Sequence, residues 1–530
     1  MDLIYNASSF WLSFLASSLQ GSEGVIPAKF DVVDISKGSI TGIARTLLYI
    51  SSCLLQLHPD FDTTQLKLYP SVESRMERYV STVQVLVTAD EELVSSINGI
   101  DCLILQGSYY INAGSPRRAW LTMRRAMNIA QLMGLHLPSC TIPGSKVTWA
   151  HIVQGDRYLV SWQVDQSISP INSFQALLLG LPAGSKDVGC GPEETFENPN
   201  TNKDDLFAKM MFNIAGRIIE RNQNEHAHTY ATTQEIDEDL ENLAAKMQRE
   251  WWDVPEELPG NCPLAAVALF GRFMFQITYF QFVALLHLPF MLRAAKEHRY
   301  EYNKFNCMKA SREMIHRYLA LRNTTIGTFC CRIFDFGAFT VTVILFLGLL
   351  ESSASGDGRD QQHQRDSDRH LVEMVLQSME QVGRSRNDLV ANQHANAIKS
   401  LLAIDSPSGQ NATNLKLSIP YLGTISIVRP LSPPPPVGKL SLPTAQPLVT
   451  AGYDPTSQRG ENISFHGDAT VNAPVVSFTS SPFSSAVPEQ MPIEGWKMSD
   501  ADTMFFDSLL NQDLAVMDLP PYVADESHGW

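Results

Sequence analysis

The chain has 530 residues, 44% of them hydrophobic, and a formal net charge of −16. This apolar content is enough to bury a large core, whereas the acidic balance disfavours a wholly cationic surface that binds nucleic acid through its phosphates. No Lys or Arg precedes Lys29, so neither a basic arm nor the charged start of a secretory signal peptide is present at this end. We therefore expect an intracellular protein.

The cysteines give no sign of a metal site. Zinc-binding cysteines usually come in pairs separated by two residues, and no pair here has that spacing. Sparse thiols in a large chain are more often reduced core residues than disulfides. The eight cysteines are Cys53, Cys102, Cys140, Cys190, Cys262, Cys307, Cys330 and Cys331.

Residues 1–405 read as an all-α body, because apolar residues recur there at helical spacing with few alternating runs. Residues 111–136 are the best example. Ser115 can cap a helix, Pro116 suits its first turn, and Gly134 can end it in the left-handed conformation that glycine adopts cheaply.

The predicted helix in 111–136 has one apolar face that we expect to be buried, and arginines on its other faces. The apolar residues of the stripe are Ala119, Trp120, Met123, Met127 and Ala130. The arginines fall mostly off this stripe, at Arg117, Arg118, Arg124 and Arg125. A solvated face is the simpler interpretation, and a nucleic-acid contact is the alternative.

Two further segments are apolar on nearly every side, residues 264–292 and 336–350. The second is shorter than the roughly 20 residues that a bilayer core requires, and Arg272 interrupts the first. We expect buried core helices rather than membrane spans.

The composition changes after residue 405. Residues 406–490 contain 13 prolines with many Ser and Thr and few charges, which predicts a disordered linker because too little apolar area is available to offset ordering. A polar loop at 351–370 and one more helical stretch, to about residue 404, precede this linker.

Residues 491–530 alternate aspartates with large hydrophobic residues, a pattern typical of acidic activation segments. If a partner's groove induced a helix, the hydrophobic residues would line one face and act as anchors. The expected anchors are Trp496, Phe505, Phe506, Leu509 and Leu510. The alternative is a C-terminal helix that docks on the chain's own body.

Catalytic and metal motifs are absent from the sequence. It contains no H-E-x-x-H, G-x-S-x-G, P-loop or G-x-G-x-x-G pattern. "EHAH" at 225–228 places His226 and His228 on different faces of a helix, so an exposed pair is favoured over a metal site. We assign no catalytic, cofactor or metal residue and expect a protein that is not an enzyme.

Several motifs in order resemble one known family. "YYINAGSPRRAWLTMRRAMNIAQLMGLH" at 109–136 is followed by "GDRYL" at 155–159 and "LLLGLP" at 177–182, and then by "LLHLPFMLR" and "NKFNCMKASREMI". Together they resemble the fungal-specific transcription factor domain, the middle homology region of zinc-cluster (Zn2Cys6) transcriptional regulators. The resemblance spans about residues 40–350.

The resemblance implies an α-helical regulatory domain in a nuclear protein that controls transcription of a metabolic or natural-product gene set. The acidic tail fits an activator that contacts the transcription machinery. Family members read DNA with a six-cysteine zinc cluster, but no cysteines of this chain match it. Promoter DNA and zinc are therefore expected only through a cluster missing from this chain, or DNA through a partner. Family members often form homodimers, and no membrane contact is expected.

Residues 160–175, "VSWQVDQSISPINSFQ", separate two motifs that adjoin almost directly in the family. Val160-Ser161 can be encoded as the splice donor GTAAGT and Phe174-Gln175 as the acceptor TTTCAG. We hypothesise a retained intron; the alternative is a surface loop.

The rival to a transcription regulator is an all-α enzyme, or a scaffold or co-regulator that does not bind DNA. An enzyme should bring acid, base or metal-binding residues together on facing helices. In a scaffold the acidic tail would only keep the chain in solution.

Overall fold

The computed structural model describes fifteen stretches of the chain. They are residues 32–137, 139–145, 148–149, 152, 195–199, 201–223, 230–254, 263–294, 297–323, 332–352, 359–386, 388–405, 414–419, 423–428 and 475–478. Within residues 32–405 every described element is helical, which confirms the all-α body.

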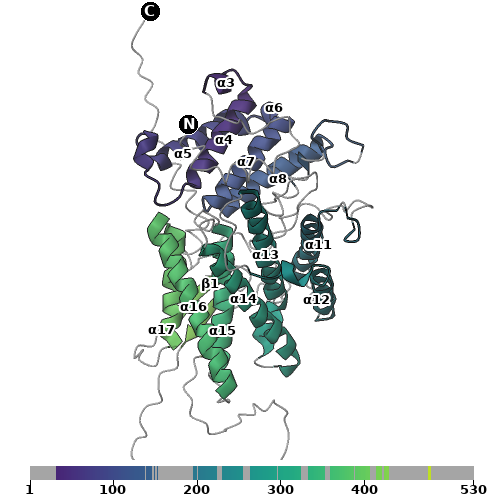
Figure 1. Ribbon diagram of the computed structural model, residues 1–530, viewed down its shortest axis with the longest axis vertical. Helices are drawn as coiled ribbons and strands as arrows, with labels where there is room; N and C mark the ends of the chain where they lie inside the picture. Colours follow the sequence, from purple (N-terminus) through teal and green to yellow (C-terminus); the bar gives the residue numbers. More distant parts are fainter. Residues whose placement is uncertain are drawn as a thin grey trace, which may run out of the picture.

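The first half of the body is a layer of helices, drawn purple to blue in Figure 1. Its elements are α3 (Val32–Ser36), α4 (Ile40–Leu55), η1 (Thr63–Leu66), α5 (Val72–Val83), the π-helical turn η2 (Gln84–Thr88), α6 (Glu91–Val94), α7 (Ile97–Asn112) and α8 (Pro116–Leu132).

Side-chain caps begin several of these helices. The hydroxyl of Ser39 accepts a hydrogen bond from Gly42 N at α4, and that of Ser96 accepts one from Gly99 N at α7. Ser115 occupies the N-cap position of α8 as predicted, but its side chain makes no capping hydrogen bond. Gly134 ends α8 with φ +74° and confirms the predicted left-handed terminus.

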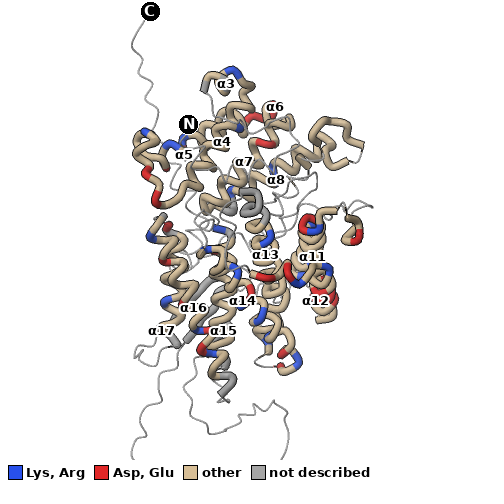
Figure 2. The backbone as a smooth tube through the Cα atoms, in the orientation of Figure 1, with Lys and Arg blue, Asp and Glu red and all other residues tan. Residues whose placement is uncertain are grey.

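The second half of the body is a bundle of longer helices, teal to green in Figure 1. Its elements are α11 (Lys203–Gln223), α12 (Tyr230–Ala244), η3 (Arg249–Trp251), α13 (Pro263–Ala294), η4 (His298–Tyr300), α14 (Glu301–Arg322), α15 (Arg332–Ser352), α16 (Arg359–Arg386) and α17 (Leu389–Asp405). Figure 2 shows charged residues along most of these helices, whereas α4 and α7 carry few.

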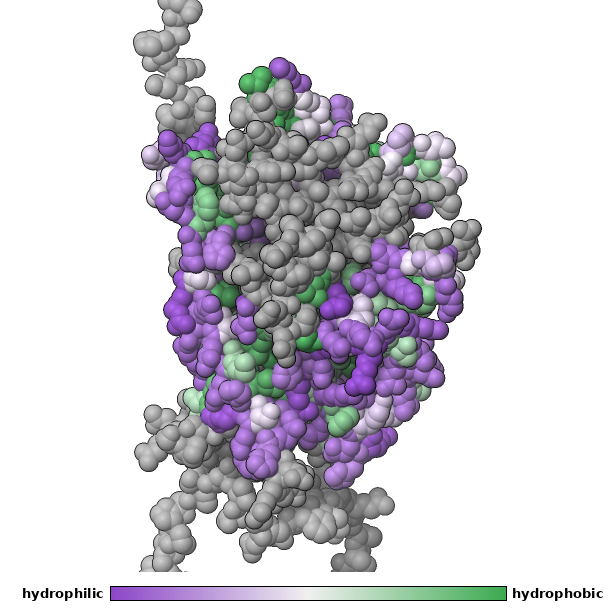
Figure 3. Space-filling model, viewed as in Figure 1, coloured by the Kyte–Doolittle hydropathy of each residue, from purple (hydrophilic) through white to green (hydrophobic). Residues whose placement is uncertain are grey.

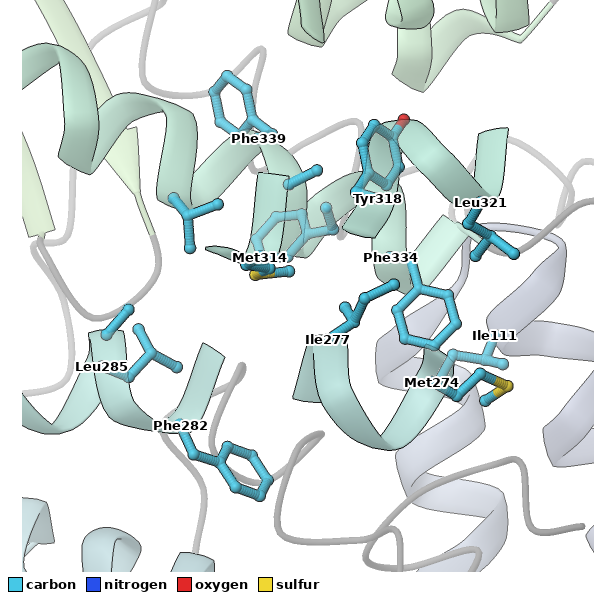
Figure 4. Close-up of a cluster of buried hydrophobic side chains, with 14 of the residues drawn as sticks. Ile111, Met274, Ile277, Phe282, Leu285, Met314, Tyr318, Leu321, Phe334 and Phe339 are labelled. Carbon is cyan, nitrogen blue, oxygen red and sulfur yellow. The ribbon is translucent and has the colours of Figure 1, made fainter. Parts of the chain in front are cut away.

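One large hydrophobic core joins the two halves. Its buried residues run from Ala44 on α4 to Leu401 on α17, and Figure 4 shows Ile111 of α7 in the same cluster as Met274 of α13 and Phe334 of α15. A second, smaller core lies between α7 and α8 around Met123. The two halves therefore pack as a single body.

Methionines cover three glycines in the middle of helices. Met123 of α8 lies over Gly107 of α7, where an added Cβ would meet the methionine Cε at 2.6 Å. Met308 of α14 lies over Gly348 of α15 in the same way, whereas Gly337 of α15 is covered by Met314 of α14 together with the amide of Gln281 of α13. The unbranched thioether fills the space that each missing side chain leaves, so the helices approach closely.

The two apolar segments are core helices, as predicted. Within the described residues, one helical stretch, Leu269–Ala294, is long and apolar enough to cross a membrane, but 78% of that window is buried inside the protein. The second apolar helix, Phe334–Leu350, is shorter. On the face seen in Figure 3, the described surface of the bundle is mainly hydrophilic with scattered apolar patches.

Three short strands follow the body. They are β1 (Asn414–Ile419), β2 (Gly423–Val428) and β3 (Val475–Phe478), and they form an antiparallel sheet in the order β1-β2-β3. The strands lie inside residues 406–490, for which composition predicted disorder throughout. "NLKLSI" and "GTISIV" alternate apolar and polar residues, a strand signal that the average composition of the long segment conceals.

Candidate functional site at the junction of the two helical halves

The arginine-bearing helix α8 has the buried stripe that the sequence predicts. Ala119, Met123 and Ala130 are completely buried, and Met127 is nearly so. Trp120, the remaining member of the predicted stripe, is only half-buried. The stripe packs on α7 and forms the smaller core.

The arginines of α8 are less exposed than predicted. Arg118, Arg124 and Arg125 are half-buried rather than on the open surface. Arg118 lies 4.4 Å from the centre of the Tyr110 ring and donates to Gln84 Oε1 at 3.2 Å. The side chain of Arg117 lies outside the described residues.

The other two described arginines also contact the protein itself. The guanidinium of Arg124 lies 5.0 Å from the centre of the Trp120 ring, and Arg125 donates to the carbonyl oxygen of Thr88. Arg118 and Arg125 thus attach α8 to the two ends of the π-helical turn η2. These arginines therefore have a structural role, which the sequence alone could not distinguish from a solvated face.

The turn between α7 and α8 requires glycine. Gly114 has φ +86°, and a Cβ at this position would collide with the guanidinium of Arg332 from the start of α15. Arg332 Nη1 donates to the carbonyl oxygen of Ala113 at 2.9 Å. The glycine of the "INAGSP" motif thus provides the conformation of the turn and the space that Arg332 occupies.

Arg332 also reaches the start of α17. Its Nε lies 3.1 Å from Oδ2 of Asp388, whose side chain is almost completely buried. Oδ1 of the same carboxylate caps α17 by accepting from Val390 N at 3.0 Å and Ala391 N at 3.2 Å. Arg332, the first residue of α15, therefore connects the α7–α8 turn to the first turn of α17.

A second ion pair lies next to this connection. Arg322 of α14 donates through Nε to Oδ1 of Asp335 at 3.1 Å, and Tyr318 donates its hydroxyl proton to the same oxygen at 2.8 Å. Burial is the main cause of a raised pKa at Tyr318, so this phenol keeps the proton that it donates.

His394 of α17 completes the group. Its ring stacks on Phe339 with 4.4 Å between ring centres, and burial lowers its pKa to about 4, with Asp335 and Asp388 opposing that effect. We call Arg322, Arg332, Asp335, Asp388 and His394 the charged junction. Two arginines face two aspartates beside a neutral imidazole, so the charges balance.

The charged junction is suited to holding helices in one arrangement rather than to reacting with a substrate. Its carboxylates accept hydrogen bonds from arginine, from tyrosine or from helix N-termini, as the distances above show. Buried ion pairs of this kind contribute little net stability but are costly to break, so they favour one packing arrangement over its alternatives.

A buried Asp–His pair elsewhere also lacks the features of a catalytic site. His287 Nε2 lies 3.0 Å from Asp237 Oδ1, and its Nδ1 lies 2.9 Å from Asn303 Nδ2. Tyr302 donates to Asp237 Oδ2 at 2.8 Å, and burial together with Asp237 raises the pKa of Tyr302 to about 12. Both imidazole nitrogens of His287 therefore have partners within the protein.

The described residues contain no group of three or more His, Cys, Asp or Glu side chains that could hold a metal ion. Cys53, Cys102 and Cys307 are buried free thiols, as expected of reduced core cysteines, and Cys140 is a half-buried one.

Several sequence predictions fall outside the described residues. These are the activation anchors, His226 and His228, the motifs at 155–159 and 177–182, and the hypothesised intron at 160–175. The charged junction and the Asp237–His287 pair were not predicted. His287 lies in the "LLHLPF" motif, but no local pattern marks a partner 50 residues away.

The proteins to which this chain is similar are fungal transcription factors and biosynthesis regulators. Transcription factor sdnS of Sordaria araneosa is 32% identical over 446 residues, which cover 79% of this chain and 56% of that protein. The Dehydrocurvularin biosynthesis regulator of Alternaria cinerariae is 31% identical over 70% of this chain and 48% of that protein. Transcription factor eupR of Phoma sp is 35% identical over 48% of this chain and 54% of that protein.

This chain thus spans about half the length of the curated relatives that it matches. No family model matches the chain, and no solved structure matches it. All three relatives carry the name of a transcription factor or a biosynthesis regulator, and none of the three is named as an enzyme.

Proposed function

We propose that this chain is the regulatory and activating part of a fungal transcription regulator that controls a set of biosynthetic genes in the nucleus. The observation that carries this proposal is the similarity to Transcription factor sdnS over 79% of the chain. The all-α body with its paired charged junction supports it, because buried ion pairs of this kind favour one packing arrangement of the helices.

The proposal is tested by deleting the gene and measuring transcripts genome-wide. We expect the transcripts of one set of biosynthetic genes to fall, and re-introduction of the gene to restore them. Unchanged transcripts under conditions in which the gene is expressed would contradict the proposal and favour a scaffold.

Promoter DNA is reached, in this proposal, through a zinc cluster in a longer form of the protein or through a DNA-bound partner. The arginines of α8 are poor candidates for a DNA reader, because Arg118 and Arg125 contact η2. Zinc is the one cofactor we infer, and only with such a cluster. A homodimer, frequent in the family that the sequence resembles, would present two readers to the promoter.

Sequencing the full transcript tests the route to DNA. An upstream exon with six cysteines would establish a direct reader, whereas a transcript that begins at Met1 would require a partner. The same sequence shows whether the codons for residues 160–175 are removed. Every valine codon begins with GT, so the acceptor side decides: a CAA codon at Gln175 would lack the terminal AG and would exclude this intron.

We infer that residues 491–530 recruit the transcription machinery through an acidic surface and a few hydrophobic anchors. Eight acidic residues and one lysine give this segment a net charge of −7 (1 − 8). The charge keeps the aromatic residues in water and available to a partner. The proposed anchors remain Trp496, Phe505, Phe506, Leu509 and Leu510.

The activation role is tested by fusing residues 491–530 to a foreign DNA-binding domain in a reporter strain. We expect activation that is lost when Phe505, Phe506, Leu509 and Leu510 are replaced by Ala. Replacing Tyr522 and Val523 by Ala is the matched control and should preserve activation. A fusion that activates nothing would leave the tail with a solubilising role.

A further inference from the structure

Gln281 is a buried polar residue whose side chain makes no hydrogen bond with the described residues. It lies on α13 and is 0% exposed. Neither Oε1 nor Nε2 of its amide has a hydrogen-bond partner among the residues that the structure describes. A buried unsatisfied amide costs about 1–3 kcal/mol, and native proteins contain few of them. The position of Gln281 therefore calls for an explanation.

The Gln281 amide meets two other helices at one point. A Cβ added to Gly337 of α15 would lie 2.7 Å from Gln281 Oε1 and 3.0 Å from Nε2. The same point is 2.8 Å from the Cε of Met314 on α14. We call Gln281, Met314 and Gly337 the Gln281 contact. Its amide lies over a glycine and beside a methionine.

Apolar side chains flank Gln281 on its own helix. Ile277 and Leu285, one turn before and one turn after Gln281 on α13, are buried, and Figure 4 shows both in the same hydrophobic cluster as Met314. A buried water needs two to four polar partners, and the donor and acceptor of the Gln281 amide supply only the lower end of that range. A ligand that pairs with the amide and also has an apolar body would in addition fit the apolar side chains beside it.

Met314 can be displaced more easily than its neighbours. Methionine is unbranched and has three rotatable bonds, so it adapts to changes in the space around it. At Gly107 and Gly348 the three atoms nearest to an added Cβ all belong to a methionine, whereas at Gly337 two of the three belong to the Gln281 amide. Movement of Met314 would thus open space directly beside an unpaired donor and acceptor.

We propose that the Gln281 contact binds a small uncharged molecule with an apolar body and an adjacent hydrogen-bond donor and acceptor. A primary carboxamide or a protonated carboxylic acid fits this description, because either can form two hydrogen bonds with the Gln281 amide. A carboxylate does not fit, since burying an ion without a counter-charge is costly. The nearby Arg317 is bonded to Gln276, Glu313 and the Trp252 carbonyl oxygen instead.

Binding at this site does not depend on the proposed function. The use of such a ligand as an effector does rest on that function, because only a regulator would convert the binding into a change in transcription. Binding is therefore measured on the purified full chain, without a reporter gene. A result of no binding would leave the expected transcript changes of the proposed function unaffected.

The test uses benzamide and acetophenone as probes. They have nearly the same shape and differ in one group, NH2 in benzamide and CH3 in acetophenone. Affinities are obtained from the dependence of the unfolding midpoint on probe concentration. We expect the ratio of benzamide to acetophenone affinity to be about tenfold higher in the natural chain than in Gln281→Met, the variant that keeps length but removes the amide.

A second variant keeps the proposal testable if the closed natural chain binds weakly. Met314→Ala removes the side chain that occupies the site, so both probes should bind more tightly to it. The benzamide preference of Met314→Ala should still disappear when Gln281→Met is added. Equal affinity ratios with and without Gln281, or no binding to either the natural chain or Met314→Ala, would overturn the proposal.

Discussion

The charged junction and the Gln281 contact are both buried among helices of the same core, but they satisfy their polar groups differently. At the charged junction, Arg332 meets Asp388 and Arg322 meets Asp335. At the Gln281 contact, the described part of the chain supplies no hydrogen-bond partner for the amide. Paired buried charges favour one arrangement of helices, whereas an unpaired buried amide raises the free energy of the folded state.

Replacing Arg332 should give the largest effect. Arg332→Met leaves the buried carboxylate of Asp388 without its arginine, and we expect the free energy of unfolding to fall by about 3 kcal/mol in urea denaturation. The matched control is Arg384→Met, which removes a far more exposed ion pair with Glu380 and should change stability by less than about 0.5 kcal/mol. Equal losses in the two variants would show that the junction is no stronger than a surface pair.

The free energy of unfolding should depend on pH because His394 of the charged junction is neutral in the folded state. The pKa of His394 is lowered from 6.5 to about 4 in the folded state, so the unfolded chain binds more protons between these values. Stability due to this residue is fully present above about pH 6.5 and is lost as the pH falls towards 4, by up to about 3 kcal/mol.

Unfolding of the natural chain and of His394→Gln, followed by circular dichroism from pH 4 to 7, checks this expectation. The natural chain should lose more stability on acidification than the variant. At low pH its unfolded form gains a proton on His394, whereas its folded form keeps this imidazole neutral, and the variant has no such group. Parallel stability curves for the two proteins would mean that His394 does not titrate with the expected shift.

Gly114→Ala tests the turn that makes room for Arg332. The left-handed backbone is strained for alanine, and its Cβ would displace the guanidinium, so we expect a loss of about 2 kcal/mol. Gly216→Ala on α11 is the control, since an added Cβ meets nothing within 4 Å there. The control should be neutral or slightly stabilising. Comparable losses of stability in Gly114→Ala and Gly216→Ala would show that the α7–α8 turn does not require glycine.

The Gln281 contact should respond in the opposite direction. Gln281→Met replaces an unpaired amide by an apolar group of similar length, and the free energy of unfolding should rise by about 1 kcal/mol. Urea denaturation without any probe measures it. A loss of stability would mean that the amide is already satisfied in the folded chain, and the contrast between the two regions would disappear.

Local features of the fold were predictable from the sequence because their signals are short-range. The spacing of Ala119, Met123 and Ala130 predicted the buried stripe of α8, and Gly134 predicted its end. The interruption of 264–292 by Arg272 and the shortness of 336–350 predicted core helices correctly. Strands β1 and β2 in 406–490 were missed because a composition averaged over 85 residues conceals two alternating segments of six.

The candidate site was not predictable, because its contacts join distant parts of the chain. Arg332 and Ala113 are 219 positions apart, and nothing near either residue marks the other. The α8 arginines were expected on the surface because helical periodicity shows which side a residue takes but not whether a neighbouring turn covers it. Gln281 has no sequence signal, since an amide in an apolar run is usually hydrogen-bonded.

The three glycines covered by methionines imply that these positions cannot change independently. A Cβ added to Gly348 would collide with the end of the Met308 side chain, so the substitution requires this methionine to move or to be replaced by a shorter residue. The same constraint joins Gly107 to Met123, whereas at Gly337 an added Cβ would meet Gln281 Oε1 as well as Met314. Among related sequences, each pair should therefore coevolve, with the small residue and the long one exchanging sides of the helix interface while their combined volume stays constant.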